Sequence, residues 1–244
     1  MVDIGCGTGA NIGSLGTGYR GIGYDVSEEA VRHARERFPD ATFVYGGVDE
    51  RAAGADLFLL MDVLEHVERD DLLLGGAIER ARPGAWIFIT VPADPELWSE
   101  HDVSFGHVRR YTRETLRTLL EAFPLEIRLL CAYNSRLYPL ALAVRRLARL
   151  RGRSMGPAGT DLVLPAAPVN AALRRILAGE SGRLRRAFRG SVEGYRRGLS
   201  LIAVARVVDP EPTNVGTDRL GDGSVEGEPN DGRPRDRPVG DGPL

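Results

Sequence analysis

The chain has 244 residues, 43% of them hydrophobic, which is enough for one domain with a core and an added elaboration or tail. Every basic residue is arginine, and the absence of lysine excludes Schiff-base, pyridoxal phosphate and phosphate-loop lysine chemistry. The two cysteines give neither a disulfide framework nor metal-ligand spacing, and the chain has no signal peptide and no apolar run near ~18 residues. We therefore expect a cytoplasmic protein without a membrane span.

The formal net charge of −2 conceals a division along the chain. Residues 1–100 carry 8 Arg and 18 acids (−10), residues 101–208 carry 20 Arg and 7 acids (+13), and residues 209–244 carry 4 Arg and 9 acids (−5). The basic middle could face an anionic substrate or a membrane surface, or could consist of solvated arginine-rich helix faces. Aromatic residues are not interleaved with these arginines, so no nucleic-acid partner is expected.

Strand and helix signals alternate from residue 1 to about 92, which predicts a parallel α/β sheet. The expected strands are Met1–Ile4, Gly21–Tyr24, Ala41–Tyr45, Ala55–Leu60 and Ala85–Val91, the last preceded by a turn at Pro83–Gly84. The expected helices lie near Ala10–Leu15, after an N-cap at Ser27, and within Val63–Ala81.

The second half of the chain is predicted to add two strands to the sheet, with a helical insertion between them. Thr112 is the expected N-cap of a further helix, and the last two strands are Leu125–Cys131 and Gly198–Val208. Between these strands, residues 133–197 form an expected helical insertion, with helices near Leu137–Leu150, Val169–Leu177 and Arg183–Tyr195. Residues 1–208 are thus predicted to form one domain, and the Gly-, Pro- and Asp-rich residues 209–244 an acidic, disordered tail.

The most informative motif is VDIGCGTG at residues 2–9, in which an acid precedes three alternate glycines at the end of a strand. Glycines there let the backbone turn sharply and let a ligand approach, which is typical of a nucleotide-binding turn. Gly5, Gly7 and Ala10 also fit the dinucleotide fingerprint, so the glycines alone leave a nicotinamide site and an S-adenosylmethionine (SAM) site open. Asp3 favours SAM, because a carboxylate can hold an amine-bearing ligand but does not suit a pyrophosphate.

Acids also follow the next strands. Asp25 ends the second strand, where a carboxylate can accept hydrogen bonds from ribose hydroxyls, and Asp49 follows the third strand, where one can meet an adenine amine. Met61–His66 follows the fourth strand, at the carboxyl edge of the sheet where α/β proteins bind ligands. Together these positions favour SAM over a nicotinamide cofactor.

On these motifs the chain resembles the class I SAM-dependent methyltransferases, in particular the small-molecule group that includes the ubiquinone-biosynthesis type. The matching segments are DIGCGTG (3–9), GYDVS (23–27), LMDVLEHV (60–67), LWSEHDVSFGHVRRYTRETLRTLL (97–120) and GLSLIAVAR (198–206). The resemblance covers residues 1–208 and implies a Rossmann-like, doubly wound, mostly parallel seven-stranded sheet with a helical insertion before the last strand. It also implies SAM as the cofactor, bound by Asp3, Gly5, Cys6, Gly7, Gly9, Asp25, Val26, Asp49, Met61 and Asp62.

Two features depart from this family pattern. Relatives carry a helical segment before the first strand, whereas here that strand begins at Met1, so we expect a misassigned start or a fragment. The ubiquinone-type relatives also carry a Glu-x-x-Glu-His cluster that can hold a divalent metal. Its counterpart here is Asp62, Glu65 and His66, and two carboxylates with one imidazole do not complete a cage, so no metal is expected.

Methyl transfer from a sulfonium is an in-line displacement, so the protein must align the reacting groups and exclude water. Oxygen and nitrogen nucleophiles often need a base, and the loop after the fifth strand offers His101 and His107 as the catalytic candidates. The expected substrate-binding residues of this loop are Trp98, Arg109, Arg110 and Tyr111. The structural alternative is that the histidines pin the loop, that the arginines lie in solvent, and that Tyr111 packs against the following helix.

The predicted function is SAM-dependent methyl transfer to an oxygen, nitrogen or carbon of a small-molecule or lipid-like acceptor. The helix expected over residues 137–153 is apolar and then basic, so it could cap a pocket or give peripheral contact with an anionic membrane. The alternatives are a non-catalytic methyltransferase-like binding module and, less favoured, an NAD(P)-dependent oxidoreductase.

Overall fold

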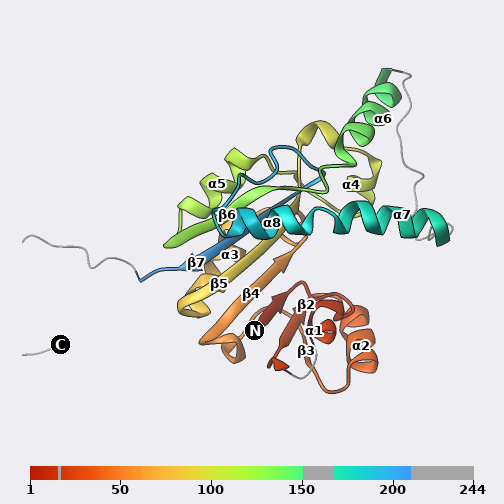
Figure 1. Cartoon of the computed structure of the whole chain (residues 1–244). Coiled ribbons are helices and arrows are strands. Elements are labelled where there is room, and N and C mark those ends of the chain that lie inside the picture. Colours follow the sequence, from red (N-terminus) through yellow and green to blue (C-terminus); the bar gives the residue numbers. More distant parts are fainter. Residues whose placement is uncertain (16–17, 151–166, 210–244) are drawn as a thin grey trace, which may run out of the picture. The chain divides into compact units, whose positions relative to one another are not determined.

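The computed structural model describes residues 1–15, 18–150 and 167–209, and its centre is a seven-stranded sheet (Figure 1). The strand order is β3-β2-β1-β4-β5-β7-β6, in which β1 to β5 pair in parallel and β7 runs antiparallel to both of its neighbours. The predicted Rossmann-like, mostly parallel seven-stranded sheet is therefore confirmed. The strands are β1 (Val2–Ile4), β2 (Ile22–Asp25), β3 (Thr42–Tyr45), β4 (Ala55–Met61), β5 (Ala81–Pro92), β6 (Leu125–Tyr133) and β7 (Ser200–Val207).

Helices cover both faces of the sheet. The α-helices are α1 (Ala10–Ser14), α2 (Glu28–Arg37), α3 (Asp70–Arg80), α4 (Glu100–Ser104), α5 (Arg113–Glu121), α6 (Tyr138–Leu150), α7 (Ala167–Ala178) and α8 (Ser181–Phe188). Short 3₁₀ turns occur at η2 (Glu50–Ala52), η3 (Leu64–His66) and η4 (Pro95–Leu97).

Alternation along the strands decides which helix covers which face. Phe43 of β3 joins the apolar cluster formed with α1 and α2, whereas its neighbour Val44 joins the main core with α3 and α5. In the same way Cys131 of β6 packs with α8, and the next residue, Ala132, faces the main core. Thus α1, α2 and α8 cover one face, and α3 and α5 cover the other, which makes the sheet doubly wound.

Both predicted helix caps are present. The Ser27 hydroxyl accepts a hydrogen bond from the backbone N–H of Ala30, and the Thr112 hydroxyl accepts one from that of Thr115. Ser27 lies two residues after β2, whereas Thr112 lies 20 residues after β5 and directly follows Tyr111, which forms an isolated bridge with Ala93 at the edge of the sheet. Each cap therefore fixes where the polypeptide enters a helix from this edge.

The structure corrects two local predictions. The Pro83–Gly84 turn lies inside β5 as an irregularity, because the β4–β5 register passes from Ala55↔Ala81 to Leu57↔Trp86 and Gly84 takes a left-handed φ of 79°. The segment after β5, predicted as a loop, contains η4 and α4. A capping box between Ser99 and Asp102 begins α4. The segment lacks the apolar periodicity of a helix, so the sequence pattern alone did not predict α4.

The insertion supplies α6, α7 and α8. Its first helix begins at Tyr138, and residues 151–153 of the expected helix lie outside the described residues, as does the expected tail from residue 210 onward. In Figure 1, α4 and α6 gather at the end of the sheet toward which β4 and β5 point. Among the described residues, no helix is both long enough and apolar enough to cross a membrane.

Candidate active site

The glycine motif forms a tight loop at the carboxyl end of β1. Gly5, Gly7 and Gly9 have φ values of 70°, 51° and 77°, a region that residues with a Cβ seldom adopt. The backbone N–H groups of Gly5 and Cys6 both donate to the Tyr24 carbonyl, at 2.8 and 3.0 Å. The sequence Gly-x-Gly-x-Gly is therefore required by the backbone path itself, and the loop is fastened to the end of β2.

Asp25 completes this fastening. One of its carboxylate oxygens accepts the Gly7 N–H at 2.7 Å, and the other accepts the Ser27 N–H at 2.8 Å. A carboxylate offers about four acceptor positions, so each oxygen retains capacity for a ligand hydroxyl. The predicted ribose contact is thus compatible with the second role of Asp25, which is to hold the glycine loop.

The space around the glycines shows where a ligand fits. A Cβ placed on Gly7 would meet no atom within 4 Å, so the loop faces open space there. A Cβ on Gly5 would collide with the Val63 side chain, which belongs to the segment after β4. The glycine loop and the Met61–His66 segment are therefore in contact through Gly5 and Val63, which lie 58 positions apart in sequence, as the prediction of a shared site requires.

Asp3 is the least satisfied charged group at this edge. Its side chain is fully buried and neither carboxylate oxygen has a hydrogen-bond partner among the described residues. Burial raises the pKa of this carboxyl to about 6. The Asn11 side chain opposes the rise as a weak hydrogen-bond donor outside ordinary hydrogen-bond geometry, and the charge of Asp25 adds to the rise. An isolated buried carboxylate is costly unless a cation or donor meets it, so Asp3 fits the amine of an amino acid-like ligand, which SAM carries.

The segment after β4 adds a second carboxylate with a raised pKa, on a residue with a strained backbone. Asp62 has a left-handed φ of 54°, and its N–H donates to the Thr90 carbonyl at 2.9 Å. Although Asp62 lies at the surface, desolvation by its surroundings raises the pKa of its carboxyl. The fold thus holds Met61 and Asp62 at the carboxyl edge, beside the glycine loop.

The remaining predicted cofactor residues differ in their surroundings. Val26 directly after β2 is 81% exposed, which leaves an apolar side chain available to cover a flat ring. Asp49 accepts a hydrogen bond from the Tyr24 hydroxyl at 2.8 Å and is also paired with Arg51, and these bonds hold the pKa of its carboxyl well below its usual range. The adenine contact of Asp49 stays a prediction, because the described chain already supplies partners for this carboxylate.

Asp102 organises the segment after β5. It is fully buried, and its Oδ1 atom lies 2.9 Å from His107 Nδ1 and accepts a bond from Arg110 Nε at 2.7 Å. Its Oδ2 atom accepts the Ser99 N–H at 2.9 Å, which closes the capping box of α4. Burial alone would raise the pKa of Asp102, but the bonds from Arg110 and His107 hold it below its usual value.

The two predicted catalytic histidines have different environments. His101 is exposed and packs its ring against Phe105 at 4.4 Å. The His107 side chain is 12% exposed, and its ring lies 4.8 Å from that of His66, edge to face. A carboxylate only accepts hydrogen bonds, so His107 Nδ1 carries a proton and donates it in a hydrogen bond to Asp102. In the neutral imidazole, Nε2 is then the acceptor.

The predicted substrate-binding arginines and tyrosine bind the protein itself. Arg109 donates to Asp70 at 2.9 Å, Arg110 donates to Asp102 and to the Ala93 carbonyl, and the buried Tyr111 hydroxyl donates to Asp70 at 2.7 Å. Neither arginine lies free in solvent, and Tyr111 packs as the structural alternative expected. These contacts tie the segment after β5 to the start of α3, and Trp98, half-buried, ends η4 in the same segment.

The segment after β4 also meets His107. Donor atoms of Glu65, His66 and His107 lie within 4.8 Å of one another, a grouping that the sequence spacing of Asp62, Glu65 and His66 did not include. Burial raises the pKa of Glu65 to about 8, with the charge of Asp62 adding to it. Near neutral pH Glu65 is therefore mostly a neutral acid that can donate a hydrogen bond beside His107.

A sequence comparison gives the chain a family. A family model described as a methyltransferase domain matches residues 1–130, which is more than half of the chain and includes β1 to β5. The Streptomyces venezuelae dTDP-3-amino-3,4,6-trideoxy-alpha-D-glucopyranose N,N-dimethyltransferase is 27% identical over 124 residues, which is 48% of this chain. The match covers 52% of that enzyme, so the chain spans about half the length of this curated relative.

Solved structures share the fold at low sequence identity. The complex of the Haloferax volcanii Trm112 methyltransferase activator with a methyltransferase matches with a TM-score of 0.52 and 16% identity, covering 85% of this chain and 82% of that one. The cyclase SpnF matches with a TM-score of 0.51 and 17% identity, covering 85% and 74%. Such likeness supports the fold, while the chemistry must come from the site.

Proposed function

Because the chain belongs to the methyltransferase domain family, we propose that it transfers a methyl group from SAM to an amine or hydroxyl group of a small molecule. Family membership confirms the predicted relationship to class I SAM-dependent methyltransferases, with SAM as the cofactor, and decides against the nicotinamide alternative. The proposal beyond this concerns the activity of the chain, its acceptor and the roles of individual residues.

One observation carries the proposal: the buried carboxylate of Asp3 has no hydrogen-bond partner in the described chain and stands behind a glycine loop with open space at Gly7. The fold opposes the charge of Asp3, so the carboxylate becomes favourable once a cation lies against it. Asp3 and the glycine loop would hold the amino acid end of SAM, Asp25 the ribose, and Val26 the adenine. When bound there, SAM supplies an activated methyl group on a sulfonium.

The chain itself must then remove a proton from the acceptor and exclude water. We assign the proton to His107 Nε2, because Nδ1 is held by the buried Asp102 and Nε2 has no hydrogen-bond partner in the described chain. Asp102 is a positioning residue: it fixes the tautomer of His107 and stabilises the imidazolium that proton transfer forms. Arg110 holds Asp102 in turn. His101, which is exposed and lacks such a partner, is the weaker of the two candidates.

Support for the acceptor class comes from one relative. The matched relative from Streptomyces venezuelae is named for N,N-dimethylation of an amino sugar. A nitrogen acceptor on a polar small molecule therefore fits the proposal better than a carbon acceptor, and it also gives His107 a proton to remove. A lipid-like acceptor and membrane contact through α6 remain predictions from the sequence.

Tritiated SAM and isothermal calorimetry test the proposal on the full chain. We expect SAM and its demethylated product to bind, and Asp3→Asn to lose most of this affinity. If the chain binds SAM but methylates no amine in a panel of acceptors, the result would favour the non-catalytic binding module, which is the alternative that the sequence left open. Failure of the folded chain to bind SAM at all would refute the proposal.

A further inference from the structure

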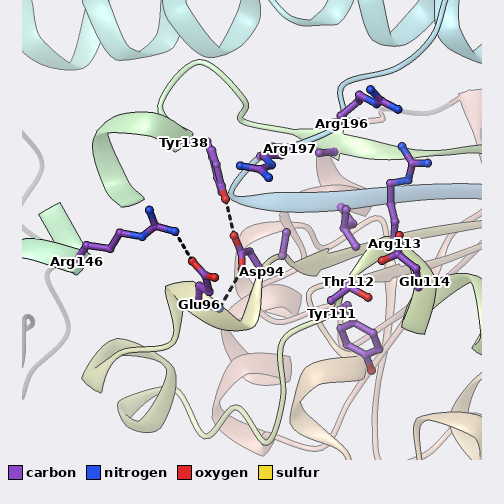
Figure 2. A pocket seen from close by; sticks show the side chains of 14 residues that line it. Asp94, Glu96, Tyr111, Thr112, Arg113, Glu114, Tyr138, Arg146, Arg196 and Arg197 are labelled. Atoms are coloured by element: carbon purple, nitrogen blue, oxygen red, sulfur yellow. Dashed lines mark hydrogen bonds and ion pairs between the residues drawn. The ribbon is translucent and has the colours of Figure 1, made fainter. Parts of the chain in front are cut away.

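A pocket lies beside the proposed active site and plays no part in the roles assigned above. Its volume is about 500 Å³, and it is lined by the segment after β5, the starts of α5 and α6, and the residues that precede β7 (Figure 2). In the β5–β7 register Pro92 pairs with Ser200, so the residues before β7 return to the edge at which β5 ends. The pocket is therefore at the carboxyl edge of the sheet, where ligands of α/β proteins bind.

The acidic side chains of the pocket have partners already. Asp94 accepts the Tyr138 hydroxyl at 2.5 Å and the Glu96 N–H at 2.9 Å, while Glu96 is paired with Arg146 at 2.8 Å. The backbone N–H of Glu114 lowers the pKa of its own carboxyl, and the Thr112 hydroxyl and the charge of Arg113 add to the effect. Asp94 and Glu96 are thus stabilised without Arg196 and Arg197, whereas Glu114 also interacts with the charge of Arg113.

Three arginines of the same lining have no such partner. Within residues 1–15, 18–150 and 167–209, the side chains of Arg113, Arg196 and Arg197 make neither a direct ion pair nor a hydrogen bond. Arg196 and Arg197 are exposed, and Arg113 interacts with the charge of Glu114 only at longer range. In the view of Figure 2 their guanidinium groups lie on one side of the pale blue β7 ribbon, whereas Arg146 reaches toward Glu96. Like charges gathered around one cavity repel each other, and an anion placed between them removes this cost.

The number of guanidinium groups indicates which anion fits. One carboxylate is satisfied by a single bidentate guanidinium, whereas a phosphate or diphosphate presents several charged oxygens to several guanidiniums at once. A cavity of about 500 Å³ also has room for an organic group attached to the phosphate. A phosphate ester or diphosphate therefore matches the charge and the size of the pocket better than a simple carboxylate.

The pocket wall is connected to the proposed base by direct hydrogen bonds. The Ala93 carbonyl, which lines the pocket, accepts a bond from Arg110 Nη1 at 2.9 Å. Arg110 in turn binds Asp102, and Asp102 binds His107. We propose that the pocket binds the phosphate or diphosphate group of the acceptor substrate, through Arg113, Arg196 and Arg197. This assignment rests on the proposed methyl transfer and narrows its acceptor to phosphorylated small molecules.

Calorimetry with inorganic pyrophosphate and with uridine diphosphate tests the pocket on the full chain, at about 0.1 M salt. We expect both probes to bind, and the double variant R196Q/R197Q to bind them at least tenfold more weakly. The double variant R185Q/R186Q removes the same charge from an exposed pair on α8 and is the matched control, with binding unchanged. No binding by the wild type, or equal loss in both double variants, would overturn the assignment.

Two further measurements separate the possible outcomes. SAM binding is measured in the same samples. If SAM binds and pyrophosphate does not, the pocket assignment fails and the proposed function stands. If pyrophosphate binds and SAM does not, the proposed function is refuted, and with it the assignment of the pocket to a methyl acceptor. Vesicles of phosphatidylglycerol, compared with phosphatidylcholine, test a lipid headgroup as the source of the phosphate. If R196Q/R197Q no longer sediments with the anionic vesicles whereas R185Q/R186Q still does, the result would support the phosphate site and assign the phosphate to a lipid headgroup.

Discussion

Replacing Asp3 by asparagine tests the central feature of the cofactor site, a carboxylate whose ionisation the fold opposes. Burial raises the pKa of Asp3 to about 6 from an ordinary value of 3.8. Between these values the folded protein binds a proton that the unfolded chain has lost, so Asp3 lowers stability as the pH rises from about 4 to about 6. This difference between the folded and unfolded pKa corresponds to about 3 kcal/mol.

Asparagine has nearly the same shape and stays neutral at every pH. Without ligand, Asp3→Asn should therefore lack this loss of stability and be up to about 3 kcal/mol more stable than the wild type near pH 7. Its affinity for SAM should fall by about tenfold to hundredfold, since a hydrogen bond to a charged group contributes about 1.5–3 kcal/mol. The substitution should thus raise the stability of the ligand-free protein and lower its affinity for SAM.

The same pKa predicts how SAM binding depends on pH in the wild type. Protonation removes the charge that attracts the amine, so the dissociation constant should rise about tenfold between about pH 7 and about pH 5. Calorimetric titrations and thermal unfolding of both proteins across this range measure the two effects, and the difference between their profiles isolates Asp3. Wild-type affinity in the variant near pH 7, or parallel unfolding profiles, would refute the reasoning.

Four further substitutions address the glycine loop, the two candidate bases and the positioning residue Asp102. Gly7→Ala should cost about 1 kcal/mol of unfolding free energy, because its φ is left-handed, and should weaken SAM binding further by filling the open space; SAM affinity equal to that of the wild type would show that the ligand lies elsewhere. His107→Asn should lower the methylation rate at least a hundredfold with SAM affinity kept, whereas His101→Asn should change the rate little; the opposite order would transfer the base to His101. Asp102→Asn leaves Arg110 buried without its charge partner and should lower the unfolding free energy by about 3 kcal/mol near pH 7 in chemical denaturation. Because the folded pKa of Asp102 is depressed, its contribution should be present above about pH 4 and be lost as the pH falls through the folded value; a variant as stable as the wild type would contradict the buried ion pair.

The cofactor half of the molecule could be predicted from short stretches of sequence. Asp3 and Asp25 lie at or next to a strand end, the three glycines follow β1 within five residues, and parallel strands bring their carboxyl ends to one edge. Alternating strand and helix patterns therefore predicted the sheet and placed the site on it. The caps at Ser27 and Thr112 are local in the same sense, because each needs only the first turn of its own helix.

The segment after β5 could not be predicted to the same depth, because its roles arise from contacts over long sequence separations. The sequence showed histidines, arginines and an aspartate within ten residues, yet it did not distinguish His101 from His107. Folding buries Asp102 beside His107 and leaves His101 at the surface. The same holds for Arg109 and Tyr111, whose partner Asp70 lies about forty residues away.

The amino-acid sequence by itself determined the fold class, the family and the position of the cofactor loop, since these depend on periodicity and on backbone conformations that only certain residues adopt. The tertiary structure alone decided which charged groups are paired. It left Asp3 buried without a partner, satisfied Arg109 and Arg110 with the protein's own acids, and left Arg113, Arg196 and Arg197 facing one cavity. Charge pairing depends on distances between segments far apart in the chain, and only packing of the helices on the sheet sets those distances.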